Sequence, residues 1–367
     1  MLRQIEHSVG WTIPTVLAVA FWATPVLGVV AHSPDSPANR PSDSILGRWG
    51  DNGSCVVISP SFVITTRHQG GWQGMTVTIN GQAYTVAEIT PNATADLCVA
   101  RLTTANGLPA YLNNFAGLYS ARNEYQKTFV MGGYGKVAGT IKYAANGLPY
   151  AYAWSGSDNN SLHWGANYVD RYSFSIPGSP FSSEAIQADF DAPGRGGAVA
   201  CESAVAEFDS GGGWFLPADG MWKVAGLSAA VEHAGESWFG DPVYGGPDPD
   251  ALYAVRVSTY ASWIDGVVKS FRVPGDANRD GFVNMTDLGI LALHFRSTGT
   301  WSDGDFTGDG LVNLADLGLI SAFWGYGTNM EAPPSSAPAP EPCSAVLLGL
   351  AGVSLAARRR MPLKASR

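Results

Sequence analysis

The feature that most constrains this chain is a serine in a glycine-rich segment that follows one histidine segment and one aspartate segment. Ser210 lies in Ala206-Glu207-Phe208-Asp209-Ser210-Gly211-Gly212. His68 follows the largely apolar run 56–66, and Asp96 precedes the run 97–102. A serine hydroxyl is a weak nucleophile, so acyl transfer needs a histidine to remove its proton and a carboxylate to orient that histidine. The sequence contains all three, in the order His, Asp, Ser.

This order and its flanking residues resemble the chymotrypsin-type (trypsin-like) serine proteases. The resemblance covers residues 43–270, and the matching segments are 56–68, 96–102, 130–135, 224–228 and 257–264. It implies a mainly β fold, a chymotrypsin-like double β-barrel. It also implies that Ser210 attacks a peptide carbonyl, that His68 is the general base, and that Asp96 orients the histidine.

The same resemblance assigns the oxyanion hole and the primary specificity pocket. The oxyanion hole consists of the backbone N–H groups of Phe208 and Ser210, although the family has glycine where this chain has Phe208. Two functions therefore stay open: a serine endopeptidase, and a catalytically inactive protease-like surface or binding protein. Ala204 is expected at the base of the pocket, with Ser228 and Ala230 beside it. Since none of the three is a carboxylate, we expect a small or apolar side chain before the cleaved bond.

Other hydrolase folds fit the sequence less well. An α/β-hydrolase needs Gly-x-Ser-x-Gly with its histidine after the serine, and position 208 is Phe. A subtilisin-like order needs an aspartate before His68, where Asp51 stands without a supporting motif. His163 is a rival base, but it lacks an accompanying aspartate and is expected on a loop.

Composition agrees with a turn-rich, mainly β chain. The 367 residues suit about two domains, 46% of them are apolar, and 44 Gly and 23 Pro indicate many turns. The net charge of -9 argues against nucleic acid as a partner, because phosphate binding needs clustered Lys and Arg.

A repeat over residues 271–328 predicts a module that binds two Ca²⁺ ions. The sequence from Gly275 to Asp287 recurs from Gly304 to Asp316. An EF-hand-like loop supplies oxygen ligands from positions 1, 3, 5, 7, 9 and 12, with glycine at position 6. The expected ligands are Asp276, Asn278, Asp280, the Phe282 carbonyl, Asn284 and Asp287 in the first loop, and Asp305, Thr307, Asp309, the Leu311 carbonyl, Asn313 and Asp316 in the second.

Each loop leads into an apolar segment with helical spacing, over residues 288–295 and 317–324. Paired loop-helix units with Asp at the last ligand position resemble a dockerin module, which implies a cohesin-like partner. The alternative is a pair of acidic turns that bind no metal. A module this small is expected to unfold without its ions.

Both ends of the chain resemble export signals. Residues 1–31 contain an uncharged apolar run and are predicted to be a signal peptide, with a membrane span as the alternative. Residues 32–42 and the Pro/Ala/Ser-rich residues 329–339 are predicted linkers. Residues 340–367 contain Pro340-Glu341-Pro342, an apolar run and Arg358-Arg359-Arg360, and resemble a PEP-CTERM sorting signal.

That resemblance implies an exosortase-type sorting enzyme and transient membrane contact. It also implies an exported protein, secreted or on the surface of a Gram-negative-type bacterium. An ordinary C-terminal anchor is the alternative.

The cysteines are Cys55, Cys98, Cys201 and Cys343. Gln69 follows His68 where the resembled family usually has a cysteine, so that family disulfide is absent. A Cys55–Cys98 disulfide and buried free thiols both stay open, and no Cys/His spacing indicates zinc.

Overall fold

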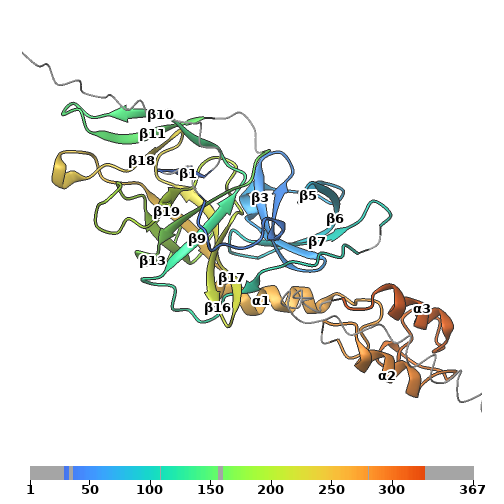
Figure 1. Ribbon diagram of the computed structural model, residues 1–367. Coiled ribbons are helices and arrows are strands. Elements are labelled where there is room, and N and C mark those ends of the chain that lie inside the picture. Colours follow the sequence, from blue (N-terminus) through green and yellow to red (C-terminus); the bar gives the residue numbers. More distant parts are fainter. Residues whose placement is uncertain (1–28, 33–35, 108, 156–159, 280, 327–367) are drawn as a thin grey trace, which may run out of the picture. The chain divides into compact units, whose positions relative to one another are not determined.

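The computed structural model describes residues 29–32, 36–107, 109–155, 160–279 and 281–326 (Figure 1). Over these residues the chain is mainly β, as expected, and its longer helices come after residue 256. The predicted linker 329–339 and sorting segment 340–367, and most of the predicted signal peptide, lie outside the described residues. No helix in the described ranges is long and apolar enough to cross a membrane.

Residues 46–103 form a closed antiparallel barrel. Its strands follow the order β2-β3-β4-β7-β6-β5, and Figure 1 shows them from blue to cyan. Alternate apolar side chains such as Val57, Val63 and Leu102 fill the interior. The strands are β2 (Leu46–Trp49), β3 (Gly53–Ser59), β4 (Phe62–Thr65), β5 (Thr76–Ile79), β6 (Gln82–Pro91) and β7 (Cys98–Thr103).

Strands between residues 117 and 256 form an eight-stranded sheet rather than a second closed barrel. Its strand order is β12-β9-β16-β17-β19-β14-β13, with β8 beside β17. Trp214 stacks on Phe129 at 4.2 Å in its core. The strands are β8 (Gly117–Leu118), β9 (Thr128–Gly133), β12 (His163–Tyr168), β13 (Arg171–Ser173), β14 (Ala185–Asp189), β16 (Gly213–Ala218), β17 (Met221–Val231) and β19 (Ala251–Arg256).

One apolar cluster joins the barrel to the sheet. It combines Leu46 and Ile64 of the barrel with Phe215 and Leu227 of the sheet, all buried. Burial of apolar surface in this shared core fixes the two β units against each other. Loops at the ends of their strands can therefore build one site.

Two small sheets accompany the second unit. The hairpin β10 (Val137–Tyr143) and β11 (Pro149–Ser155) pairs with β18 (Glu236–Trp238). The strand β1 (Val30–Ala31) pairs with β15 (Ser203–Ala204) and is buried. His32, which follows β1, stacks on Phe190 at 4.5 Å. The predicted signal peptide 1–31 and linker 32–42 therefore overlap the folded domain at Val30, Ala31 and His32.

The helices close the described chain. In α1 (Val257–Ser270) the residues Val257 and Ile264 are fully buried in the shared core. Helices α2 (Met285–Leu293) and α3 (Leu314–Ala322) each begin with a capping box, Asn284/Asp287 and Asn313/Asp316. The 3₁₀ helices are η1 (Asp43–Ile45), η2 (Arg67–Gln69), η3 (Pro242–Tyr244) and η4 (Trp301–Asp303).

Cys55 and Cys98 are free thiols in the structure. Cys55 and Cys98 are both buried, and burial raises the pKa of the Cys98 thiol to about 12. Of the two possibilities left open by the sequence, the structure has the buried thiols.

Candidate active site

The three predicted catalytic residues come from three separate turns. His68 lies in η2, immediately after β4. Asp96 lies between β6 and β7, in a turn that the Asn92 side chain holds by accepting the N–H groups of Thr94 and Ala95. Ser210 lies just before β16 of the second sheet. The barrel thus supplies the histidine and the aspartate, and the second sheet supplies the serine.

These side chains form one hydrogen-bonded chain. The Asp96 carboxylate is buried, and its Oδ2 lies 2.7 Å from His68 Nδ1. Its Oδ1 accepts the backbone N–H of His68 at 2.7 Å. His68 Nε2 lies 2.9 Å from Ser210 Oγ. Since the carboxylate accepts from Nδ1, the proton of a neutral imidazole belongs on Nδ1, and Nε2 is free to accept the serine proton.

The peptide of Phe208 takes the backbone conformation that favours glycine. Its φ is +78°, in the left-handed region. For a residue with a Cβ this conformation costs about 1–3 kcal/mol, and such strain persists only where the surroundings hold it. One restraint is the Ser54 hydroxyl, which donates to the Phe208 carbonyl at 3.0 Å. Phe208 therefore has the left-handed conformation that glycine adopts most easily.

Asp209, next to Ser210, is a buried carboxylate. Its Oδ1 accepts the Gly135 N–H at 2.7 Å, and its Oδ2 accepts the Ala206 N–H at 2.9 Å. Burial raises the pKa of this carboxyl to about 7, although the two N–H groups act in the opposite direction. A Cβ at Gly133 or Gly135 would lie within 2.3 Å of the carboxylate, so both positions require glycine. Within the described ranges, no Lys or Arg forms an ion pair with Asp209.

A mostly apolar pocket of about 380 Å³ opens beside Ser210. Ser228 and Ala230, two of the three residues predicted for a specificity pocket, line it. Ala204 does not, because β15 pairs with β1 and leaves Ala204 fully buried; Val205 and Ala206 line the pocket instead. The lining residues are Trp154, Val205, Ala206, Glu207, Ser210, Ser228, Ala229, Ala230, Val231, Ala234 and Gly235.

Sequence reasoning missed Trp154. It belongs to β11, far from the matching segments, and no local pattern marks it as part of the pocket. The pairing of β11 with β18 places this side chain there, and its Nε1 donates to Ser237 Oγ at 2.9 Å.

His163 does not lie on a loop, contrary to expectation, but begins β12 opposite Gly133. Burial lowers the pKa of His163 to about 4.

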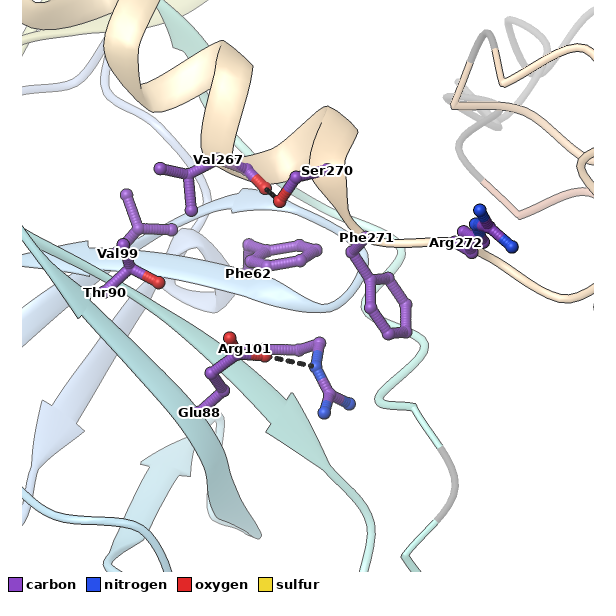
Figure 2. A pocket seen from close by; sticks show the side chains of 9 residues that line it. All are labelled: Phe62, Glu88, Thr90, Val99, Arg101, Val267, Ser270, Phe271 and Arg272. Atoms are coloured by element: carbon purple, nitrogen blue, oxygen red, sulfur yellow. Dashed lines mark hydrogen bonds and ion pairs between the residues drawn. The ribbon is translucent and has the colours of Figure 1, made fainter.

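A second pocket, of about 280 Å³, lies where the end of α1 meets the barrel (Figure 2). Phe271 packs edge-on against Phe62 there, and the Arg101 guanidinium lies 4.5 Å from the Phe271 ring. Arg101 also pairs with Glu88 at 3.7 Å. No histidine or cysteine is among the residues that line this pocket.

The two predicted calcium loops precede α2 and α3. In each loop the first and last expected carboxylates are buried: Asp276 and Asp287, Asp305 and Asp316. Gly281 and Gly310, at loop position 6, have φ values of +86° and +84°, as the sharp turn requires. Asp280 lies outside the described residues.

These residues suit a hard cation, because buried carboxylates in a module with so small a core need a compensating charge. In the structure, backbone N–H groups of the loops donate hydrogen bonds to these carboxylates and compensate part of their negative charge. Asp287 accepts from Ala277 at 3.0 Å, and Asp316 accepts from Phe306 at 2.9 Å. Within the described ranges, no three or more His, Cys, Asp or Glu side chains are grouped so that they could hold a metal ion. A calcium loop of this kind would also draw oxygen ligands from amide side chains and backbone carbonyls. The remaining residues at the expected ligand positions are Asn278, Phe282 and Asn284 in the first loop, and Thr307, Asp309, Leu311 and Asn313 in the second.

No protein-family profile matches this chain, and no curated protein matches it. Among solved structures the chain is similar to neuropsin, a serine protease expressed in the limbic system of mouse brain. The two share 14% sequence identity with a TM-score of 0.41, and the similarity covers 64% of this chain and 98% of neuropsin.

Proposed function

We propose that this protein is an exported serine endopeptidase that carries a calcium-dependent, dockerin-like module. The observation behind the enzymatic part is the hydrogen-bonded chain from Asp96 through His68 to Ser210. A partly exposed serine next to an apolar pocket completes the arrangement that acyl transfer needs.

In the proposed reaction Ser210 Oγ attacks the carbonyl carbon of a peptide bond while His68 Nε2 takes its proton. Asp96 holds the imidazole in place and stabilises the imidazolium that forms. The N–H groups of Phe208 and Ser210 would donate to the oxyanion, and loss of one such donor costs a factor of about 10²–10³ in kcat. His68 then protonates the leaving amine. Water next attacks the acyl-enzyme carbonyl while His68 takes the proton of the water, and His68 returns this proton to Ser210 Oγ as the carboxylic acid product leaves.

The pocket favours a small or apolar side chain before the cleaved bond. Its walls are contributed by residues such as Val205, Ala229 and Val231. Its one carboxylate, Glu207, is exposed and pairs with Lys136 at 2.5 Å. A substrate Lys or Arg would therefore be buried without a partner, which is costly.

The second candidate is an inactive protease-like binding protein, which the strain at Phe208 favours. Labelling with a fluorophosphonate separates the two functions, because the reagent needs an activated serine and a working oxyanion hole. We expect labelling of the wild-type protein and none of Ser210→Ala. An unlabelled, folded wild-type protein would eliminate the endopeptidase function.

We propose that export removes the segment before Val29 rather than the segment up to Ala31. A cut after Ala31 would delete the buried strand β1. Gly28 and Val26 are small residues that suit a signal-peptidase site before Val29. If the register of β1 continues, Val29 lies opposite Val205, beside the Ala206 N–H that donates to Asp209. A new amino terminus there would be close to a buried carboxylate.

The module of residues 271–328 is proposed to bind two Ca²⁺ ions and, through them, to present a surface to a cohesin-like protein. Calcium titration of the full chain by calorimetry tests the first step. We expect two sites in the wild type and one in Asp305→Ala, because each loop has its own ligand set. Sorting by an exosortase-type enzyme through residues 340–367, with transient membrane contact, stays part of the proposal.

A further inference from the structure

One side chain, Gln69, joins the turn of His68 to the loop of Ser210. Gln69 follows His68 in η2, and its Nε2 lies 2.6 Å from the Ser210 carbonyl oxygen. The same nitrogen lies 2.9 Å from Thr65 Oγ1 and 2.8 Å from Thr66 Oγ1. The Ser210 carbonyl also accepts the backbone N–H of Ser54 at 2.8 Å.

The surroundings require the amide nitrogen, rather than the amide oxygen, on this side. The Ser210 carbonyl can only accept hydrogen bonds. The Thr65 hydroxyl donates its proton to the Ser54 carbonyl at 2.7 Å, so it has only lone pairs left for Gln69. The two N–H groups of the amide can therefore serve the Ser210 carbonyl and one threonine.

The backbone approaches this amide closely at two glycines. A Cβ at Gly53 would lie 1.2 Å from Gln69 Oε1. A Cβ at Gly211 would lie 2.2 Å from the Ser54 carbonyl oxygen and 2.5 Å from Gln69 Nε2, and Gly211 has a φ of +78°. Position 211 thus depends on glycine, and a side chain at position 53 would displace the Gln69 amide.

Ser54 of β3 restrains the same loop at a second point. Its hydroxyl donates to the Phe208 carbonyl at 3.0 Å and accepts the Tyr134 N–H at 3.0 Å. Ser54 is fully buried. The strained peptide at Phe208 and the carbonyl of Ser210 are therefore both held by groups of the opposite β unit.

We propose that Gln69 and Ser54 are positioning residues that set the distance between His68 Nε2 and Ser210 Oγ and orient the Phe208 and Ser210 N–H groups. We call this pair the Gln69–Ser54 clamp. The inference rests on the proposed endopeptidase function.

The test compares Gln69→Leu with the wild type on an apolar ester or peptide substrate and with a fluorophosphonate. Leucine removes both amide donors and keeps a similar volume. We expect kcat and the labelling rate to fall together by about 10- to 100-fold, since a misplacement on the order of 1 Å costs about that much. KM should change by no more than about threefold, because the pocket is untouched. Gln82→Leu, on the exposed end of β6, is the matched control and should leave all three values unchanged.

If folded Gln69→Leu has the same kcat and labelling rate as the wild type, the proposed clamp is refuted. If Gln69→Leu does not fold, Ser54→Ala is used in its place. The expected result is again a lower kcat and labelling rate with little change in KM, and wild-type values would again refute the clamp. If the wild-type protein itself is not labelled, the endopeptidase function fails, and amide hydrogen exchange of residues 207–211 tests the clamp separately. Faster exchange in Gln69→Leu or Ser54→Ala than in the wild type supports it, and unchanged exchange refutes it.

Discussion

Position 208 gives a prediction whose sign depends on the backbone alone. In Phe208→Ala and Phe208→Gly the ring is absent from both proteins, so their difference in stability reports the conformation at φ +78°. An L-residue in the left-handed region costs about 1–2 kcal/mol. Glycine loses about 0.5–1 kcal/mol more backbone entropy on folding than alanine does. Phe208→Gly should therefore be more stable than Phe208→Ala by about 0.5–1 kcal/mol.

The assay is equilibrium unfolding in urea, compared with a control at which the sign is opposite. Gly266 lies inside α1, and a Cβ there meets no atom within 4 Å. Gly266→Ala should raise the free energy of unfolding by about 1 kcal/mol, because alanine is the better helix former. If alanine is as stable as glycine at position 208 while the control behaves as expected, the serine loop does not hold this peptide in the left-handed conformation. The Phe208 N–H would then lack the orientation that the proposed oxyanion hole requires.

Three further predictions concern the triad, the pH dependence and the amino terminus. Asp96→Asn should lower kcat by about 10⁴-fold with little loss of the fold, since an amide favours the wrong imidazole tautomer; steady-state kinetics measures this, and near-normal kcat would exclude Asp96 from the triad. Burial raises the pKa of Glu202 from its ordinary 4.5 to about 8, so the folded state binds this proton more tightly than the unfolded state does. The stability that this proton contributes is lost as the pH rises from 4.5 to about 8. Unfolding free energies should thus decrease with pH more steeply in the wild type than in Glu202→Gln, and parallel profiles would contradict the burial argument. Amino-terminal sequencing of exported protein should begin at Val29; a start at His32 would show that β1 is not retained.

Much of the general fold and the choice of site residues could be predicted from local sequence. The alternating apolar segments, the turn-forming glycines and the order of His68, Asp96 and Ser210 indicate a mainly β chain with this cluster of side chains. The mainly β class is confirmed, and the structure brings the three side chains within hydrogen-bonding distance. The two repeated loops are also visible in the sequence, since a ligand pattern with glycine at position 6 is a property of a short segment.

Other features depend on residues far apart in the chain, and only the tertiary structure decided them. Trp154 reaches the pocket because β11 pairs with β18, and Ala204 is excluded from it because β15 pairs with β1. The sequence marks Gln69 only as a missing cysteine, whereas the structure places its amide 2.6 Å from the Ser210 carbonyl. Phe208 by its identity argues for a displaced loop, yet hydrogen bonding from Ser54, a residue of the opposite β unit, accompanies a glycine-like φ. Residue type sets the chemistry and the local conformational preference, but packing and hydrogen bonds between distant segments decide which strained conformations are kept.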